Sequence, residues 1–288
     1  YNNPRLLSHC GVPFDPIKTA AHDTFLAVGG DPSGNRSLPF KKPGALDFRT
    51  ATDLQNLLVK LTSKFHMNMV FLVNSGAEAV SNSVKISMHR KFREVRTRLG
   101  DELFAEMCSQ LGIRRSSSLG EIYSDYPLFG LAAMGAFHGR TLDALSLTNS
   151  KKVHKEGFPT IKWVKHVDIV DSVLDPSALI CETDLKTLIS TRSLNRVVYE
   201  EGRVPAELLA YAIVEPIQGE GGYRIPLTEN IKTLADICHA HNALLISDEV
   251  QAGIGRTGRW WGIEHHGVSP DIIAAAKGLR VGAVISRA

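Results

Sequence analysis

Apolar and polar positions alternate along this chain in two different patterns. In 52–66 and in 76–95 the apolar residues recur every three or four positions, which predicts amphipathic helices. Short continuous apolar runs predict strands that are buried on both faces. These runs lie at 69–73, 128–134, 208–214, 243–247 and 271–276. A further helix is predicted to start at a Thr228 cap and to end at Asn242.

The alternation of strands and helices predicts an α/β fold, with a mostly parallel sheet flanked by helices. Residues 1–50 differ, because they are rich in Gly, Pro, Asn and Asp and lack a sustained period. We expect a loop-rich N-terminal segment at 1–50 and one large domain over 51–288. Residues 93–126 are strongly charged and are predicted to form an irregular surface insertion that is helical only at 101–111.

Composition and charge exclude several classes of partner. Hydrophobic residues make up 43% and charged residues 22% of the 288 positions, as in ordinary globular proteins. The 33 basic and 30 acidic residues are balanced and dispersed, so no nucleic-acid partner is expected. No apolar run approaches the roughly 18 residues of a membrane span, so no membrane partner is expected either.

Four cysteines bear on the compartment. Cys10, Cys108, Cys181 and Cys238 are widely separated and lack the spacing of a disulfide framework or a zinc site. We therefore expect a reducing compartment, the cytoplasm in the first place. The first five residues do not look like a secretory leader, but the chain does not begin with Met, so an organellar matrix remains open.

Two charged residues stand at the ends of predicted strands. Asp248 follows the run 243–247, and Lys277 follows the run 271–276. Because ligands bind beyond the carboxyl ends of parallel strands, we expect both side chains to face one site. A structural ion pair would explain them, since an unpaired buried charge costs several kcal/mol. Pyridoxal phosphate chemistry would also explain them, because it uses a lysine that forms a Schiff base and an aspartate that protonates the ring nitrogen.

Three other strand ends carry polar or small residues. The stretch 74–79 opens a helix with small residues, which suits a phosphate but is equally typical of a helix cap without a ligand. The stretch 135–141 offers an aromatic face, an imidazole and a guanidinium, although each could serve packing or a surface turn. The stretch 214–222 adds two carboxylates and an amide on a Gly-rich turn.

Two other motifs are weaker. The stretch 253–258 matches GxGxxG, but it is not followed by a helix opening or by the acidic residue that a dinucleotide site needs. The pairs His265–His266 and His239–His241 lack a carboxylate or Cys partner at metal-ligand spacing, so no metal is expected.

Taken together, these motifs resemble those of the class III (ω-) aminotransferases, which are pyridoxal phosphate enzymes of fold type I. The resemblance is strongest at 69–90, 128–155 and 208–279. It is carried, in the family's order, by Asn74–Ala79, Gly135–Thr141, Val214–Gly222, Ser247–Gln251 and Ala276–Gly278. The separation of Asp248 from Lys277, 277 − 248 = 29 residues, is also similar to that of the family.

The resemblance implies roles for particular residues. Lys277 would form the Schiff base and then move a proton, and Asp248 would pair with the ring nitrogen. Cofactor contacts are further implied for Ser75, Gly76 and Ala77 at the phosphate, for Phe137 and Val250 on the two ring faces, for Gln251 at the ring hydroxyl, and for His138 and Glu215 beside the ring. On the substrate side, Arg140 would hold a carboxylate, and Glu220 would be a switch that pairs with an arginine.

The chain also departs from the family. Family members continue beyond the lysine with a phosphate-binding threonine given to the partner subunit, with the arginine partner of the switch and with a small domain. We expect that small domain to be largely absent from this chain and residues 1–50 to lead from it. The segment 278–284 is shorter than the family's glycine-rich loop. The resemblance implies a homodimer.

The substrate is open at this stage. Residues 135–155 and the insertion at 93–126 are similar to the 4-aminobutyrate branch, with 2-oxoglutarate as the acceptor. Residues 74–76 and 276–279 are more similar to the ornithine, acetylornithine and lysine branches or to related racemases. We favour 4-aminobutyrate or a similar ω-amino acid. A non-catalytic homologue that binds pyridoxal phosphate is the alternative from another class.

Overall fold

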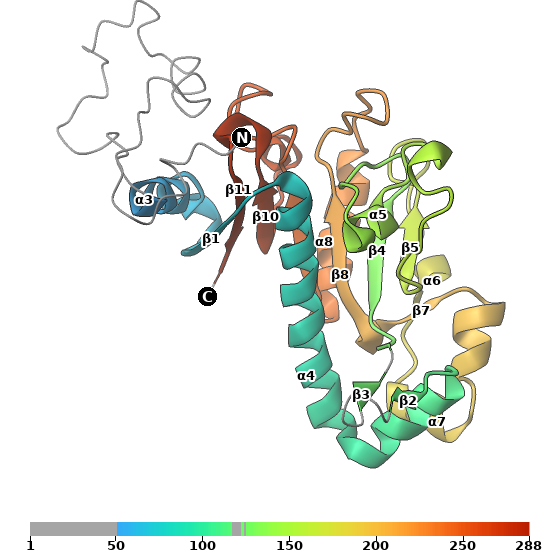
Figure 1. The fold of residues 1–288 in the computed structure, drawn as a ribbon. Coiled ribbons are helices and arrows are strands. Elements are labelled where there is room, and N and C mark those ends of the chain that lie inside the picture. Colours follow the sequence, from blue (N-terminus) through green and yellow to red (C-terminus); the bar gives the residue numbers. More distant parts are fainter. Residues whose placement is uncertain (1–50, 117–121, 124, 288) are drawn as a thin grey trace, which may run out of the picture.

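The computed structural model describes residues 51–116, 122–123 and 125–287, so the predictions for 1–50 lie outside the described residues. Within these residues, seven strands form one sheet in the order β1-β11-β10-β9-β8-β4-β5 (Figure 1). The strands are β1 (Met69–Val73), β4 (Phe129–Ala133), β5 (Val164–Val167), β8 (Leu209–Val214), β9 (Leu244–Asp248), β10 (Ile272–Ala275) and β11 (Gly282–Ser286).

Strand directions bring six carboxyl ends to one edge of this sheet. The strands β5, β4, β8, β9 and β10 are parallel to their neighbours, which confirms the predicted mostly parallel sheet. Strand β11 is antiparallel to β10, and β1 is antiparallel to β11. Strand β1 therefore runs in the same direction as β10, and its carboxyl end lies at the same edge as those of β4, β8, β9 and β10.

Helices cover the sheet on both faces. The main helices are α3 (Ala51–Leu61), α4 (Gly76–Gln110), α5 (Leu142–Leu147) and α8 (Thr228–Ala240). Helix α4 packs against β8, β10 and β11 and lies in front of the sheet in Figure 1, whereas α8 packs against β8 and β9. All six residues of β8 are buried, because both of its faces are covered.

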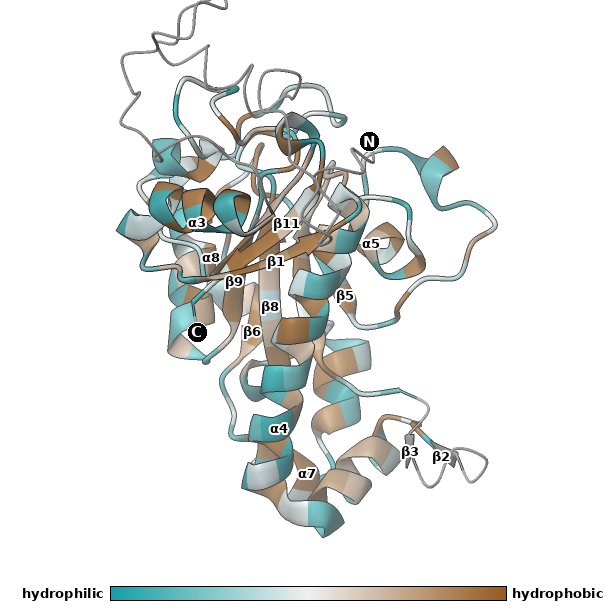
Figure 2. Ribbon diagram, turned by 60° about the vertical axis from the view of Figure 1, so that its left-hand side comes forward, coloured by the Kyte–Doolittle hydropathy of each residue, from teal (hydrophilic) through white to brown (hydrophobic). Residues whose placement is uncertain are grey.

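The core follows the apolar runs of the sequence. Strand β10 is buried throughout, as is β9 apart from its first residue, Leu244. Figure 2 shows the brown strands enclosed by helices whose outer faces are teal. Trp261 is fully buried, and its indole N–H donates to the Leu61 carbonyl at 3.0 Å, which ties the end of α3 to the core.

Helix α4 corrects the prediction of an irregular insertion from residue 93. The helix continues to Gln110, and it buries Val95, Leu99 and Phe104 in its second half. Gly100 has φ +70°, which is outside the helical region, and kinks the helix there. The kink changes the phase of the apolar positions, and this explains why the sequence period did not reveal one continuous helix.

Smaller elements fill the connections. The stretch 168–205, which lacked a motif, contains α6 (Pro176–Leu179), β6 (Ile180–Cys181), α7 (Leu185–Ser190), the π-helical turn Arg196–Glu200 and β7 (Val204–Pro205). Strands β6 and β7 form a separate pair, as do β2 (Arg115–Ser116) and β3 (Ile122–Tyr123). No helix in the described residues has both the length and the apolarity needed to cross a bilayer.

One local prediction was wrong. Thr228 does not cap α8 but is its first residue, and its hydroxyl lies 3.1 Å from His266 Nδ1. The N-cap is Leu227, whose side chain makes no cap bond. After Lys277, the sequence analysis did not predict a strand, but Gly282–Ser286 forms β11 between β1 and β10.

Candidate active site

A pocket of about 510 Å³ lies at the edge of the sheet where the carboxyl ends of β1, β4, β8, β9 and β10 meet. Ten of the twelve predicted site residues line it. They are Ser75, Gly76, Ala77, Phe137, His138, Glu215, Asp248, Val250, Gln251 and Lys277. These residues come from the ends of β1, β4, β8, β9 and β10, so residues far apart in the sequence meet because of the strand order.

Asp248 is buried at the end of β9 and is held by two donors. Its Oδ2 lies 2.7 Å from His138 Nδ1, and its Oδ1 accepts the Val250 N–H at 3.0 Å. An ionised carboxylate only accepts hydrogen bonds, so Nδ1 is the protonated ring nitrogen in this pair. The other nitrogen, His138 Nε2, is buried and has no hydrogen-bond partner among the described residues.

Lys277 begins the short 3₁₀ helix Lys277–Leu279 directly after β10. Its Nζ donates to Gln251 Oε1 at 2.7 Å. The alternative of a structural ion pair is not supported, because within the described residues Asp248 pairs with His138 and Lys277 pairs with Gln251. The amine is therefore presented to the pocket rather than neutralised by the aspartate.

The start of α4 forms another wall of the pocket. Ser75 is the N-cap, and its hydroxyl accepts the Glu78 N–H at 3.2 Å, while the Glu78 carboxylate accepts the Asn74 N–H at 2.7 Å. The first N–H groups of a helix, here those of Gly76 and Ala77, have no carbonyl partner one turn earlier. An added Cβ at Gly76 would lie 2.7 Å from Val250 Cγ1, so only glycine fits against the Val250 side chain.

Glu215 acts as an anchor at the end of β8. Its carboxylate accepts the Phe137 N–H at 2.7 Å and the Gly219 N–H at 3.2 Å. Burial raises the pKa of this carboxyl above its ordinary value. His138 opposes the rise, and the charge of Asp248 adds to it by less than His138 takes away. Glu215 thus fixes the two turns that carry Phe137 and Gly219 beside the pocket.

The two predicted substrate residues lie outside the pocket lining. Arg140 is exposed, and its guanidinium carbon lies 5.9 Å from the centre of the Phe137 ring. Glu220 is exposed and pairs with Lys151, 3.1 Å away, which lowers the pKa of the carboxyl. Neither residue is part of the lining that contains Lys277 and Asp248.

Residues without a predicted role also line the pocket. They are Asn74, Gly139, Ala276, Arg280 and Val281. Arg280 could have been found from the sequence, because a cation three residues after Lys277 in a short connection must remain near the same strand end. Another residue without a predicted role, the buried Glu249, accepts the Gly262 N–H at 2.8 Å and the Ile263 N–H at 2.9 Å and so fixes the loop that follows Gln251.

The pocket fits pyridoxal phosphate in its chemistry. It offers a primary amine on Lys277, a buried carboxylate on Asp248 and a helix N-terminus suited to a phosphate. The unpartnered His138 Nε2 shows that the polar groups there are not all satisfied by the protein. Among the described residues no cluster of three or more His, Cys, Asp or Glu side chains has the arrangement of a metal site.

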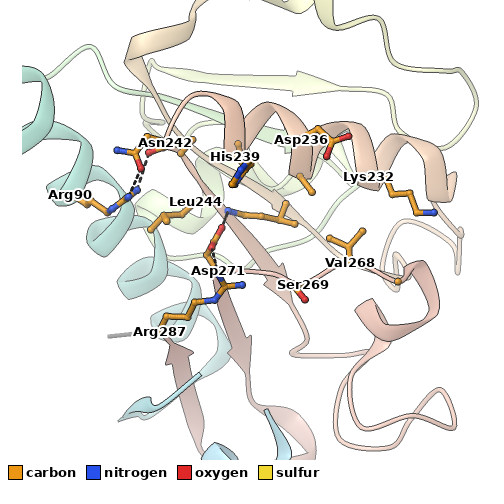
Figure 3. Close-up of a pocket in the computed structure, with 15 residues that line it drawn as sticks. Arg90, Lys232, Asp236, His239, Asn242, Leu244, Val268, Ser269, Asp271 and Arg287 are labelled. Atoms are coloured by element: carbon orange, nitrogen blue, oxygen red, sulfur yellow. Dashed lines mark hydrogen bonds and ion pairs between the residues drawn. The ribbon is translucent and has the colours of Figure 1, made fainter. Parts of the chain in front are cut away.

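A second cavity, of about 520 Å³, lies at the opposite edge of the sheet and is shown in Figure 3. Several of its charged groups are engaged with one another: Arg90 donates to the Asn242 carbonyl at 2.9 Å, and Arg287 lies 3.7 Å from Asp271.

Comparison with known proteins defines the family. The family described as aminotransferase class-III matches residues 40–288. Acetylornithine aminotransferase from Prochlorococcus marinus is 33% identical over 225 residues, 78% of this chain and 42% of the relative. 4-Aminobutyrate aminotransferase from Mycobacterium leprae is 34% identical over 215 residues, 73% of this chain and 39% of the relative.

A solved structure agrees with these relatives. Lysine aminotransferase from M. tuberculosis superimposes with a TM-score of 0.54 at 25% identity, covering 93% of this chain and 53% of that one. The chain belongs to the class-III aminotransferase family and has the large-domain fold of a fold type I pyridoxal phosphate enzyme. The cofactor of this family is pyridoxal phosphate, as predicted. The chain spans a little under half the length of the curated relatives it matches.

Proposed function

We propose that this chain carries the cofactor site of an aminotransferase that moves the amino group of an ω-amino acid to a 2-oxo acid such as 2-oxoglutarate. The observation that carries the proposal is the meeting of the Lys277 amine and the Asp248–His138 pair in one pocket at the start of α4. The class-III family supports the reaction type. The reducing compartment expected from the sequence is compatible with Cys108, Cys181 and Cys238 as free thiols.

Pyridoxal phosphate, when bound, supplies an aldehyde that takes up the amino group and a ring that accepts the electron pair released on proton removal. Asp248, fixed by His138 and Val250, would hold a proton at the ring nitrogen. Lys277 would bond to the cofactor and, once released, would carry the proton to and from the reacting carbon. Gln251, which accepts from Lys277 Nζ, would orient the amine before it reacts.

The amino donor is proposed by class. Residues 135–155 favour 4-aminobutyrate by their resemblance, and one relative with 34% identity is named a 4-aminobutyrate aminotransferase. Other relatives at similar identity are named acetylornithine aminotransferases, which favours N-acetylornithine as the second candidate. Both donors carry a primary amine far from a carboxylate, so both need a cation such as Arg140 at a distance from Lys277.

Lys277→Ala tests the cofactor assignment. The wild-type chain should form an absorbance band at about 410–430 nm with pyridoxal phosphate, because a protonated Schiff base absorbs there. The variant should lose the band and should bind the cofactor only reversibly. Borohydride reduction followed by peptide mapping should label Lys277, and Lys232→Ala, in the second cavity, is the matched control. Labelling of another lysine, or unchanged absorbance in the variant, would show the assignment to be wrong. A band without any transamination would favour the non-catalytic homologue.

Arg140→Lys tests the substrate class. Losing a bidentate carboxylate contact should lower kcat/KM for the carboxylate-bearing donor by about 30- to 1,000-fold. An alkyl amine without a carboxylate should be spared. The measurement is kcat/KM with 4-aminobutyrate, N-acetylornithine, ornithine, lysine and an alkyl amine, using 2-oxoglutarate as the acceptor. An equal loss with every donor would assign Arg140 a structural role.

A further inference from the structure

Arg280 occupies an unusual position directly after Lys277–Leu279. It ends that 3₁₀ helix with φ +59°, and its N–H donates to the Lys277 carbonyl at 3.0 Å. The left-handed region is costly for a residue with a Cβ and is usually occupied by glycine or asparagine. A long charged side chain at a backbone position of this kind indicates that the side chain has a function.

The backbone around Arg280 is pressed against the start of α4. Gly282 pairs with Val73 across the β1–β11 ladder, and an added Cβ at Gly282 would lie 2.3 Å from the Ser75 carbonyl oxygen. The turn from Lys277 to Gly282 is therefore fixed beside the N-cap of α4. Arg280 lines the same pocket as Ser75, Gly76 and Ala77.

The guanidinium has no acidic partner among the described residues. The carboxylates that line the pocket are engaged elsewhere: Asp248 with His138 and Val250, and Glu215 with two backbone N–H groups. Glu78, the acid in the first turn of α4, accepts from the Asn74 N–H. The exposed Arg280 thus brings a cation without an acidic partner to the pocket whose lining also includes the first residues of a long helix. The buried, unpartnered His138 Nε2 is separate evidence that this pocket is built for a ligand.

An anion with several oxygens fits this arrangement. A guanidinium binds phosphate through paired N–H donors, and a helix start adds backbone donors and a favourable dipole. We propose that Arg280 binds the phosphate group of pyridoxal phosphate together with the N–H groups of Gly76 and Ala77. The phosphate is then held by one chain on the side of the pocket formed by α4. This inference rests on the proposed cofactor site but not on the identity of the amino donor.

Arg280→Gly is the decisive variant, because glycine accepts φ +59° without strain and removes only the side chain. The cofactor-free chain is titrated with pyridoxal 5′-phosphate and, separately, with pyridoxal, which lacks the phosphate. Binding is followed by the band at about 410–430 nm. The variant should bind pyridoxal phosphate about 10- to 100-fold more weakly, which is the loss expected for a charge-assisted contact. Its affinity for pyridoxal and its melting temperature should not fall.

Three comparisons complete the test. Arg280→Lys should keep part of the affinity, because it retains the charge but not the paired donors. Arg256→Ala removes an exposed arginine outside the pocket lining and should have no effect. Inorganic phosphate should compete with pyridoxal phosphate in the wild-type chain and more weakly in Arg280→Gly.

Several outcomes would overturn the proposal. Equal weakening of pyridoxal and pyridoxal phosphate would mean that Arg280 only shapes the loop. Unchanged cofactor affinity with a raised KM for the amino donor would mean that the guanidinium binds the substrate carboxylate instead. A wild-type chain that forms no band with either compound would refute the cofactor site itself, whereas a band lost in Lys277→Ala but unchanged in Arg280→Gly would refute the Arg280 proposal alone.

Discussion

Asp248 shows how burial and partner choice act on a single residue. A carboxylate enclosed at a strand end must be hydrogen-bonded, because an unpaired buried charge is costly. The structure gives it His138, 110 positions away in the sequence, and not Lys277. The lysine amine therefore stays available to the pocket, while one oxygen of the aspartate is fixed by the imidazole and the other by the Val250 N–H.

Glu249, the next residue, is predicted to make stability depend on pH. Burial raises the pKa of this carboxyl from 4.5 to about 7, although three hydrogen bonds to it act in the opposite direction. At pH values between these two pKa values, the folded state then binds more protons than the unfolded state. The contribution of Glu249 to the free energy of unfolding is thus fully present below a pH of about 4.5 and is lost as the pH rises through about 7.

The measurement is chemical denaturation of the wild-type chain and of Glu249→Gln at several pH values from 4.5 to 8. Across this window the wild type should lose stability relative to the variant by up to about 1.4 kcal/mol per pH unit. The difference between the two proteins cancels the contribution of the other titrating groups. A difference that does not change with pH would show that the carboxyl titrates at its ordinary pKa.

At the scale of elements, the junction of β1, α4 and β11 positions the pocket. Gly282 allows β11 to start against the Ser75 carbonyl, since even a methyl group would lie 2.3 Å from that oxygen. Backbone atoms at such a junction cannot move aside as a flexible side chain can. The position of the α4 start relative to Lys277 thus depends on this close contact.

Gly282→Ala should destabilise the fold by about 1–3 kcal/mol, because the added methyl group overpacks the junction. It should also weaken cofactor binding, because it separates the two walls that carry Ser75 and Arg280. Denaturant unfolding and cofactor titration measure the two effects. Ser286→Ala, at the other end of β11, is the control, and equal stability of both variants would contradict the predicted contact.

At the scale of the whole molecule, exposed apolar side chains near the pocket suggest a partner surface. The loops 149–161 and 219–226 are linked by the Lys151–Glu220 ion pair. They carry Phe158, Tyr223 and Ile225 with 60%, 79% and 65% of their surface exposed. Exposed apolar groups gathered on neighbouring loops are typical of surfaces that bind another chain.

We predict that the active unit is a homodimer that covers this surface. Tyr223→Asp should shift the chain toward monomer and lower its activity in parallel, because a charge would be buried at the contact. Sedimentation velocity at several protein concentrations measures the oligomeric state. Met69→Asp, at the start of β1, replaces another exposed apolar side chain and should leave the oligomeric state unchanged. A fully active wild-type monomer would refute the prediction.

The sequence by itself determined five of the seven strands of the sheet, their order along the chain and the charged or small residues at their ends. Continuous apolar runs are nearly unambiguous for buried strands, and small or charged residues directly after them mark the edge where ligands bind. Together with the resemblance of these motifs to the class III aminotransferases, this allowed ten residues to be named that line one pocket. The prediction of α4 was wrong around Gly100, because a kink there shifts the phase of the apolar positions. The predicted N-cap at Thr228 was also wrong, because its hydroxyl contacts His266 instead of capping the helix.

Only the tertiary structure decided which of these groups face one another. The pairing of Asp248 with His138 and the approach of Arg280 to the start of α4 depend on strand order and on β11, whose antiparallel insertion between β1 and β10 leaves no periodic signal. Arg140 and Glu220 lie on the same turns as pocket residues but are not part of the lining. Local sequence patterns determine the helices and strands, whereas contacts between residues distant in the sequence arise from packing the whole chain around one sheet.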